Sequence, residues 1–173
     1  MRQKHIFSAF LLLCFAWSAC QSPKPAPQPA PADLLTEIRN AAANGFDSSF
    51  ARQMGADEYG MKPYVMAFLK RGPNRTQDSV TAAQLQKAHL DNIGRMAEAG
   101  QLVVAGPFMD DGDVRGIYIF NVGTVEEARR LTETDPAIQA GRLTMELHPW
   151  YGSAALPLLL PLHKKLEKNS VAD

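Results

Sequence analysis

Hydrophobic residues recur at helical spacing between Thr81 and Ala99, and this segment organises the rest of the chain. The repeated positions, four, four and three residues apart, are Leu85, His89, Ile93 and Met96. They share one face of an amphipathic helix, so His89 is the polar member of an otherwise apolar stripe. Gly100 is a typical helix stop, and the apolar run Leu102–Ala105 after it predicts a short strand.

Other hydrophobic runs complete a recognisable order of elements. Three more segments have the composition of strands: Tyr64–Lys70, Gly116–Val122 and Arg142–His148. A second helix is predicted for Val125–Thr132, where Thr124 and Glu127 have the spacing of a capping box. The order β-α-β-β-α-β predicts an α+β, ferredoxin-like fold.

The pattern within the strands also predicts self-association. The first and third strands are apolar on both faces, whereas two helices can cover only one face of a four-stranded sheet. We therefore expect a second copy to cover the other face, giving a homodimer. On the last strand, Thr144, Glu146 and His148 alternate with apolar residues and would either line a cavity or mark a solvated rim.

The N-terminus has the pattern of an export signal. Arg2 and Lys4 precede the apolar run Ile6–Trp17, which is short for a membrane span, and small residues lead to Cys20. This order resembles the bacterial lipoprotein signal, in which the cysteine is lipidated and anchors the exported protein to a membrane. An ordinary secretory signal, cut nearby, is the alternative.

Changes in composition along the sequence divide the chain into five segments. We interpret residues 1–19 as the signal, 20–33 as the lipidated cysteine with a proline-rich tether, and 34–61 as a helical extension packed on the main domain. Residues 62–152 form that domain and residues 153–173 a C-terminal arm. Four leucines of the arm are expected to dock on the dimer: Leu156, Leu159, Leu160 and Leu162.

Charge and cysteine content exclude several functions. The 18 basic and 18 acidic residues cancel, so no electrostatic attraction to nucleic acid is expected. Cys14 lies in the signal and Cys20 would carry the lipid, so the mature protein has no cysteine for a disulfide, a nucleophile or a metal site.

Four short motifs carry a resemblance to a known family. They are Lys87-Ala88-His89-Leu90, Thr134-Asp135-Pro136-Ala137, Ala140-Gly141 and Val104-Ala105-Gly106-Pro107-Phe108. Together they resemble the YCII-related domain family, whose hallmark is a histidine in the first helix and an aspartate after the second. The resemblance implies a dimeric α+β barrel with a His89–Asp135 pair in a pocket. One branch of the family acts in dehydrochlorination of a chlorinated hydroxyhydroquinone, and muconolactone isomerases and small monooxygenases share the fold.

The pair suggests acid–base chemistry. Asp135 could accept one ring N–H of His89 and leave the other nitrogen to transfer a proton. The carboxylate favours the imidazolium, whereas burial favours the neutral ring. No serine or cysteine lies in a nucleophile motif, which favours proton transfer over covalent catalysis. The alternatives are a hydrogen-bonded core histidine and an aspartate that only ends a helix.

Further candidates extend the site. Pro107, Glu146 and His148 are candidate substrate contacts, although a polar strand face is commonly solvated. Lys70, Arg71 and Arg115 could receive an anionic substrate, with solvated loop charges as the simpler interpretation.

No cofactor is expected, and no metal, because His89, Asp135 and His148 lack the spacing of a ligand set. Two functions remain open: an enzyme that transfers a proton in or eliminates a group from a cyclic, oxygenated small molecule, and a non-catalytic binding module with the same pocket.

Overall fold

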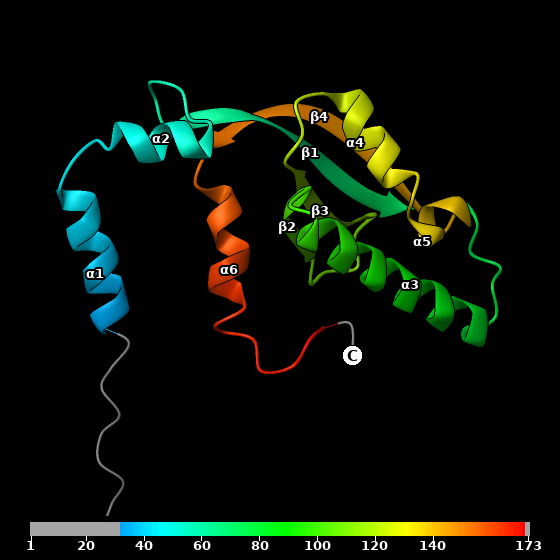
Figure 1. Ribbon diagram of the computed structural model, residues 1–173. Coiled ribbons are helices and arrows are strands. Elements are labelled where there is room, and N and C mark those ends of the chain that lie inside the picture. Colours follow the sequence, from blue (N-terminus) through cyan, green and yellow to red (C-terminus); the bar gives the residue numbers. More distant parts are fainter. Residues whose placement is uncertain (1–31, 172–173) are drawn as a thin grey trace, which may run out of the picture. The chain divides into compact units, whose positions relative to one another are not determined.

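The computed structural model describes residues 32–171 of the chain (Figure 1). It divides at Phe46 into two units, of which the first has helix α1 (Ala32–Ala43) in its described part. The second unit, from Asp47 onward, contains the sheet and all the site residues below. The predicted signal, Cys20 and most of the tether lie outside the described residues.

The second unit follows the predicted order of elements. Its helices and strands are α2 (Ser48–Met54), β1 (Met61–Arg71), α3 (Ser79–Glu98), β2 (Leu102–Pro107), β3 (Val114–Phe120), α4 (Val125–Thr132), α5 (Pro136–Gln139), β4 (Leu143–Ser153), the 3-10 turn η1 (Leu156–Leu158) and α6 (Leu159–His163). The four strands form one antiparallel sheet in the order β2-β3-β1-β4. This is the strand order of a ferredoxin-like fold, so the predicted α+β fold class is confirmed.

Local sequence determines where helices α3 and α4 begin and where α3 ends. Asp78 caps α3 by accepting the Thr81 N–H at 2.9 Å, and Gly100 follows the helix in the left-handed conformation at φ +69°. The predicted capping box of α4 is present: the Glu127 N–H donates to the Thr124 hydroxyl, and the Thr124 N–H donates to the Glu127 carboxylate.

The bounds of the elements differ from the prediction by a few residues in several places, and the largest differences are in β4 and α5. Strand β4 continues past the predicted end at His148 to Ser153, through Pro149. Because β4 is an edge strand, a residue without an N–H is tolerated there. The four-residue helix α5 is also not predicted, because an Asp-Pro pair after a helix is typical of a helix end and does not by itself indicate that a new helix begins.

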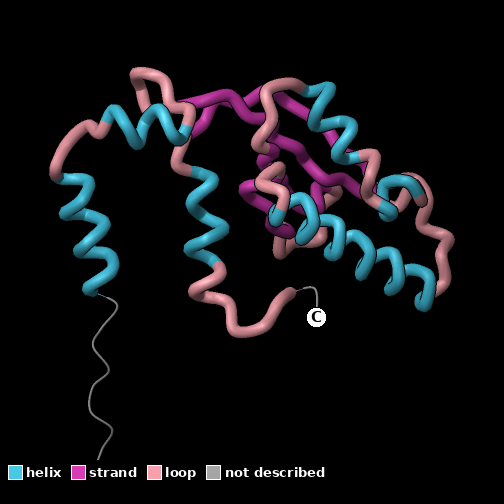
Figure 2. Tube along the Cα trace, viewed as in Figure 1, coloured by secondary structure: helices cyan, strands magenta, loops and turns pink. Residues whose placement is uncertain are grey.

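Helices α3 and α4 cover one face of the sheet (Figure 2). Val65, Ala67 and Leu69 alternate along β1 toward this face, where they pack with Met96 of α3 and Ala128 of α4. The core also contains Leu102, Tyr118 and Phe120. The apolar face predicted for α3 is thus the face that packs on the sheet.

Within the described residues from Asp47 onward, the opposite sheet face is covered only in part. Tyr64 and Ile119 are buried there, and Leu156 packs against their cluster from the C-terminal arm, whose described part after β4 is residues 154–171. We call the remainder, with Met66, Phe68 and His148, the open face. The start of the arm therefore packs on its own domain. From the sequence, the leucines of the arm are expected to dock on a dimer, and this contact within one chain is not predicted.

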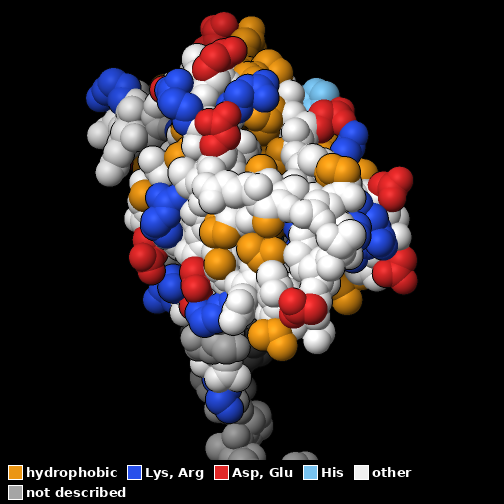
Figure 3. Space-filling model, turned by 90° about the vertical axis from the view of Figure 1, so that its right-hand side faces the viewer, with side chains coloured by type: hydrophobic (Ala, Val, Ile, Leu, Met, Phe, Trp, Pro, Cys, Tyr) orange, Lys and Arg blue, Asp and Glu red, His pale blue; other side chains and the backbone are white. Residues whose placement is uncertain are grey.

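Charged side chains on the surface are mixed by sign. On the face seen in Figure 3, basic and acidic residues alternate around small hydrophobic clusters. This distribution agrees with the zero net charge, and the face shows no single-sign stripe of the kind that follows a nucleic-acid backbone.

Candidate functional site

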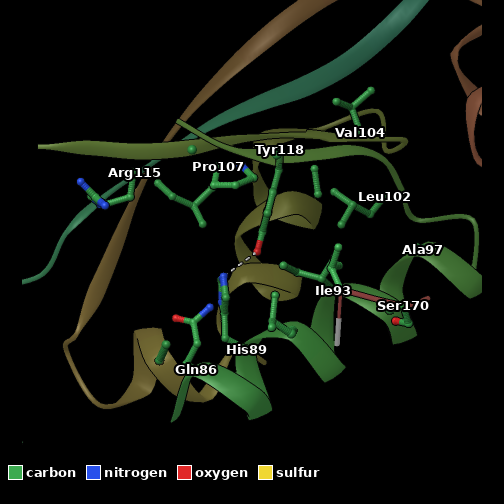
Figure 4. Close-up of a pocket in the computed structure, with 18 of the residues that line it drawn as sticks. Gln86, His89, Ile93, Ala97, Leu102, Val104, Pro107, Arg115, Tyr118 and Ser170 are labelled. Atoms are coloured by element: carbon green, nitrogen blue, oxygen red, sulfur yellow. Dashed lines mark hydrogen bonds between the residues drawn. The ribbon is translucent and has the colours of Figure 1, made fainter. Parts of the chain in front are cut away.

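A cavity of about 540 Å3 lies between α3 and the β2–β3 side of the sheet, and the C-terminal arm lines part of it. In Figure 4, His89 and Tyr118 meet in the middle of the cavity, with Arg115 toward one end and Ala97 and Ser170 toward the other. The apolar lining residues include Leu90, Ile93, Leu102, Val104 and Leu160. The cavity has the mixed lining of a small-molecule site, with few polar groups among apolar ones.

His89 contacts Asp135 through one ring nitrogen and faces the cavity with the other. The Nδ1 atom is 2.6 Å from Asp135 Oδ2, a short contact typical of a charge-assisted hydrogen bond. His89 is 7% exposed and Asp135 is completely buried, so water does not compete for this bond. With Nδ1–H donating to the carboxylate, Nε2 of the neutral ring is an acceptor that points toward the cavity.

Asp135 is held in place by its position at the start of α5. Its second oxygen, Oδ1, accepts the Ala137 N–H at 2.8 Å as the N-cap of this helix. Pro136 occupies the first helical position, where a missing N–H costs nothing. The two carboxylate oxygens are therefore divided between a backbone cap and His89.

Hydrogen bonds from α3 also anchor the turn before Asp135. The Thr134 hydroxyl donates to Asn92 Oδ1 at 3.1 Å, and Arg95 donates to Asn92 Oδ1 at 2.7 Å and to Thr134 Oγ1 at 2.9 Å. Asn92 lies one turn after His89 on the buried side of α3. This network fixes the aspartate turn against the helix that carries the histidine.

Tyr118 of β3 is the third member of the group. Its hydroxyl lies 3.4 Å from His89 Nε2, and the two rings are stacked with centroids 6.3 Å apart. Burial, and next the negative charge of Asp135, raise the pKa of Tyr118 above its usual value of 10.0. The phenol therefore keeps its proton at neutral pH and acts as a donor toward Nε2 or toward a bound ligand.

The structure separates the other candidate site residues. Pro107 lines the cavity as predicted. Glu146 and His148 instead project from the open face, on the other side of the sheet, where His148 Nε2 is 2.9 Å from Glu146 Oε1. Glu146 also pairs with Lys70, and hydrogen bonds from Lys70 and then His148 lower its pKa.

Sequence reasoning missed Tyr118, Asn92 and Thr134. Tyr118 and Phe120 are two residues apart in an apolar strand and therefore lie on the same, buried face of the sheet. That Tyr118 lies opposite His89 depends on how α3 crosses the sheet, which the sequence does not show. A polar residue three positions after His89 was the available signal for Asn92.

Neither a metal cluster nor a membrane helix is found in the part of the chain that the structure describes. Among residues 32–171, no three His, Cys, Asp or Glu side chains are grouped so as to hold a metal ion. Within the same range, no helix has the length and hydropathy to cross a bilayer.

Comparison with known proteins identifies the domain. A family model described as the YCII-related domain matches residues 64–150. No curated protein matches the chain. The matched range extends from β1 into β4 and includes both His89 and Asp135.

Proposed function

The chain belongs to the YCII-related domain family, and from this premise we propose that it is an acid–base enzyme acting on a cyclic, oxygenated small molecule. His89 is the proton-transfer group and Asp135 positions it. One observation carries the proposal: His89 Nδ1 bonds a fully buried carboxylate while Nε2 faces a cavity large enough for a small molecule.

The geometry suits removal of a proton next to a carbonyl or hydroxyl group. His89 Nε2 takes the proton, and Asp135 stabilises the imidazolium that forms through the Nδ1–H bond. Next to a carbonyl, the electron pair of the broken C–H bond forms a C=C bond and the carbonyl π electrons move onto oxygen, giving an enolate. Next to a carbon that bears a hydroxyl or another leaving group, the pair forms the C=C bond as the bond to that group breaks and the group departs with its electrons. The Tyr118 hydroxyl can donate a hydrogen bond to the oxygen on which negative charge develops.

A binding module without catalysis is the second candidate. The position of the Tyr118 hydroxyl favours it, because this hydroxyl lies close enough to hydrogen-bond His89 Nε2, and a nitrogen that already has a partner is less free to accept a proton. At 3.4 Å this contact is longer than an ordinary hydrogen bond, so a ligand can displace it at small cost.

Isotope exchange tests the enzymatic proposal at its first step, the removal of a carbon-bound proton. Cyclic ketones, lactones and hydroxylated ring acids are incubated with the protein in heavy water, and proton NMR follows the loss of carbon-bound hydrogen. His89→Gln is expected to slow exchange by about 10²–10⁴-fold, the usual contribution of a positioned acid–base group. Lys87→Gln, on the exposed side of the same helix, is the matched control. Equal exchange by wild type and His89→Gln would contradict the proposal, and ligand binding without exchange would favour the binding module.

We further propose that a lipid on Cys20 anchors the protein to a membrane. Support comes from the basic, apolar and small-residue order that precedes this cysteine. Cys20→Ser is expected to shift the protein from the membrane fraction to the soluble fraction after cell lysis. Membrane association that is unchanged in the variant excludes the lipid anchor.

A homodimer through the open face is the proposed assembly. Its support is the half-buried apolar surface of Met66, Phe68 and Ile117 beside the Glu146–His148 pair. Light scattering at micromolar concentration should give a dimer mass for the chain from Asp33 onward. Phe68→Asp should give a monomer, whereas Val80→Asp, at an exposed position of α3, should not. A monomer mass for the unsubstituted chain contradicts this assembly.

A further inference from the structure

Three arginines line the cavity although they are distant in the sequence. Arg75 lies in the loop after β1, Arg115 near the start of β3 and Arg142 just before β4. Antiparallel pairing brings the end of β1 and the beginnings of β3 and β4 to one end of the sheet. The loops are joined there by backbone hydrogen bonds from Gly72 N–H to Arg142 O and from Asn74 N–H to Gly141 O.

These arginines are held by neutral acceptors. Arg75 donates to the carbonyl oxygen of Arg142 at 3.2 Å, and Arg142 donates to Gln77 Oε1 at 3.2 Å. Arg115 donates to the carbonyl oxygens of Asp110 and Gly112. Within the described residues, none of the three forms an ion pair with a carboxylate, including those of the nearby acidic loop at Asp110–Asp113.

The positive charges are close enough to affect one another. Partial desolvation, followed by the charges of Arg142, Arg71 and Arg115, lowers the pKa of Arg75, whose side chain is still exposed to solvent. The cavity also contains Glu98 and Glu167, but Glu167 pairs with His163 and Lys164 on the C-terminal arm. Like charges gathered at one end of a cavity create a positive potential that attracts anions.

The rest of the cavity has a different character. Beyond His89 and Tyr118, away from Arg115, the lining contains the aliphatic side chains of Ile93, Leu102 and Val104, with Ser170 of the C-terminal arm at the same end (Figure 4). A molecule occupying the whole cavity would therefore meet arginines at one end, His89 and Tyr118 in the middle, and aliphatic side chains together with Ser170 at the other end.

We propose that the ligand of this cavity carries an anionic oxygen group, a carboxylate or a phosphate, which Arg75, Arg115 and Arg142 bind. Its apolar ring lies against His89 and Tyr118. Guanidinium groups present paired N–H donors that match both anions, and each arginine uses only one of its two terminal nitrogens in the hydrogen bonds described above. This inference rests on the proposed use of the His89 cavity as the site, and it adds the substrate class.

Matched pairs of charged and neutral ligands test the inference. Benzoate, 4-hydroxybenzoate and cyclohexanecarboxylate are titrated against the full chain by NMR, each beside its carboxamide. Phenyl phosphate separates the phosphate source from the carboxylate source. At least one anion is expected to bind about tenfold or more tightly than its neutral counterpart, which corresponds to about 1.4 kcal/mol. If none of the anions binds, or if the carboxamides bind equally well, the inference is wrong.

Variants locate the binding and separate this inference from the enzymatic proposal. Arg75→Gln, Arg115→Gln and Arg142→Gln should each weaken anion binding about tenfold, whereas Arg130→Gln, at an exposed position of α4, should not.

His89→Gln should retain anion binding while losing isotope exchange. Anion binding without exchange in the wild type leaves the inference standing and removes the catalytic proposal. If the wild type exchanges the carbon-bound hydrogen of neutral ligands and shows no preference for anions, the catalytic proposal stands and the inference of an anion site is wrong. Binding that is equal in the three arginine variants and the wild type contradicts the assigned subsite.

Discussion

Replacing His89 by leucine is expected to destabilise the domain by about 3–5 kcal/mol, the usual cost of breaking a buried pair by removing one partner. Leucine suits an apolar helix face better than histidine does, and a view limited to α3 would predict a gain in stability. The loss arises at Asp135, which is completely buried and would keep only the Ala137 N–H as a donor. Urea denaturation of the variant and the wild type measures the change in the free energy of unfolding, provided that the two proteins have the same dependence of this free energy on urea concentration (the m value).

A second substitution shows whether the aspartate causes the loss. In His89→Leu/Asp135→Asn, the asparagine can still cap α5 but carries no charge, so much of the lost stability should return. Lys87→Leu, on the exposed side of α3, is the control and should change stability by about 0.5 kcal/mol or less. If His89→Leu is as stable as the wild type, the contact with Asp135 contributes nothing to the fold.

Asp135→Asn alone is expected to reduce exchange activity by about 10²–10⁴-fold while the domain stays folded. The asparagine oxygen is expected to keep the bond to the Ala137 N–H, because losing the cap would leave a buried donor without a partner. Its amide N–H then faces His89 Nδ1, which must become an acceptor. The ring proton moves to Nε2, and the nitrogen facing the cavity can no longer accept a proton from a substrate.

Exchange activity and stability are measured on the same preparation of this variant. A loss of activity at nearly unchanged stability is the expected combination, because capping survives and only the ring tautomer changes. Wild-type activity in Asp135→Asn would mean that the aspartate serves the fold alone.

The parts of the fold that depend on neighbours in sequence could be predicted. Helix α3 followed from the spacing of its apolar face and from Gly100, and α4 from Thr124 and Glu127, since caps use residues within one turn. The pairing of His89 with Asp135 came from the motifs that resemble the family. Its physical basis, an N-cap that shares one carboxylate between two donors, is visible only in the structure.

What could not be predicted depends on contacts across the fold. Alternation in β4 showed that Glu146 and His148 point away from Leu147, but not that the cavity lies on the leucine side of the sheet. The arginine cluster arises because the Arg75 loop bonds to the turn before β4, a contact between segments more than 60 residues apart. The predicted strand ends at His148, and the position of β4 at the sheet edge explains why the strand continues through Pro149 to Ser153.

The tautomer of His89 decides whether this ring can accept a proton from a molecule in the cavity. Long-range proton–nitrogen NMR correlation on ¹⁵N-labelled protein distinguishes the two nitrogens of the neutral ring. We expect a proton on Nδ1, donated to Asp135, and an unprotonated Nε2 whose resonance shifts when a ligand enters the cavity. A neutral ring with its proton on Nε2 and none on Nδ1 would rule out His89 as the base, because the nitrogen that faces the cavity would then have no lone pair to accept a proton.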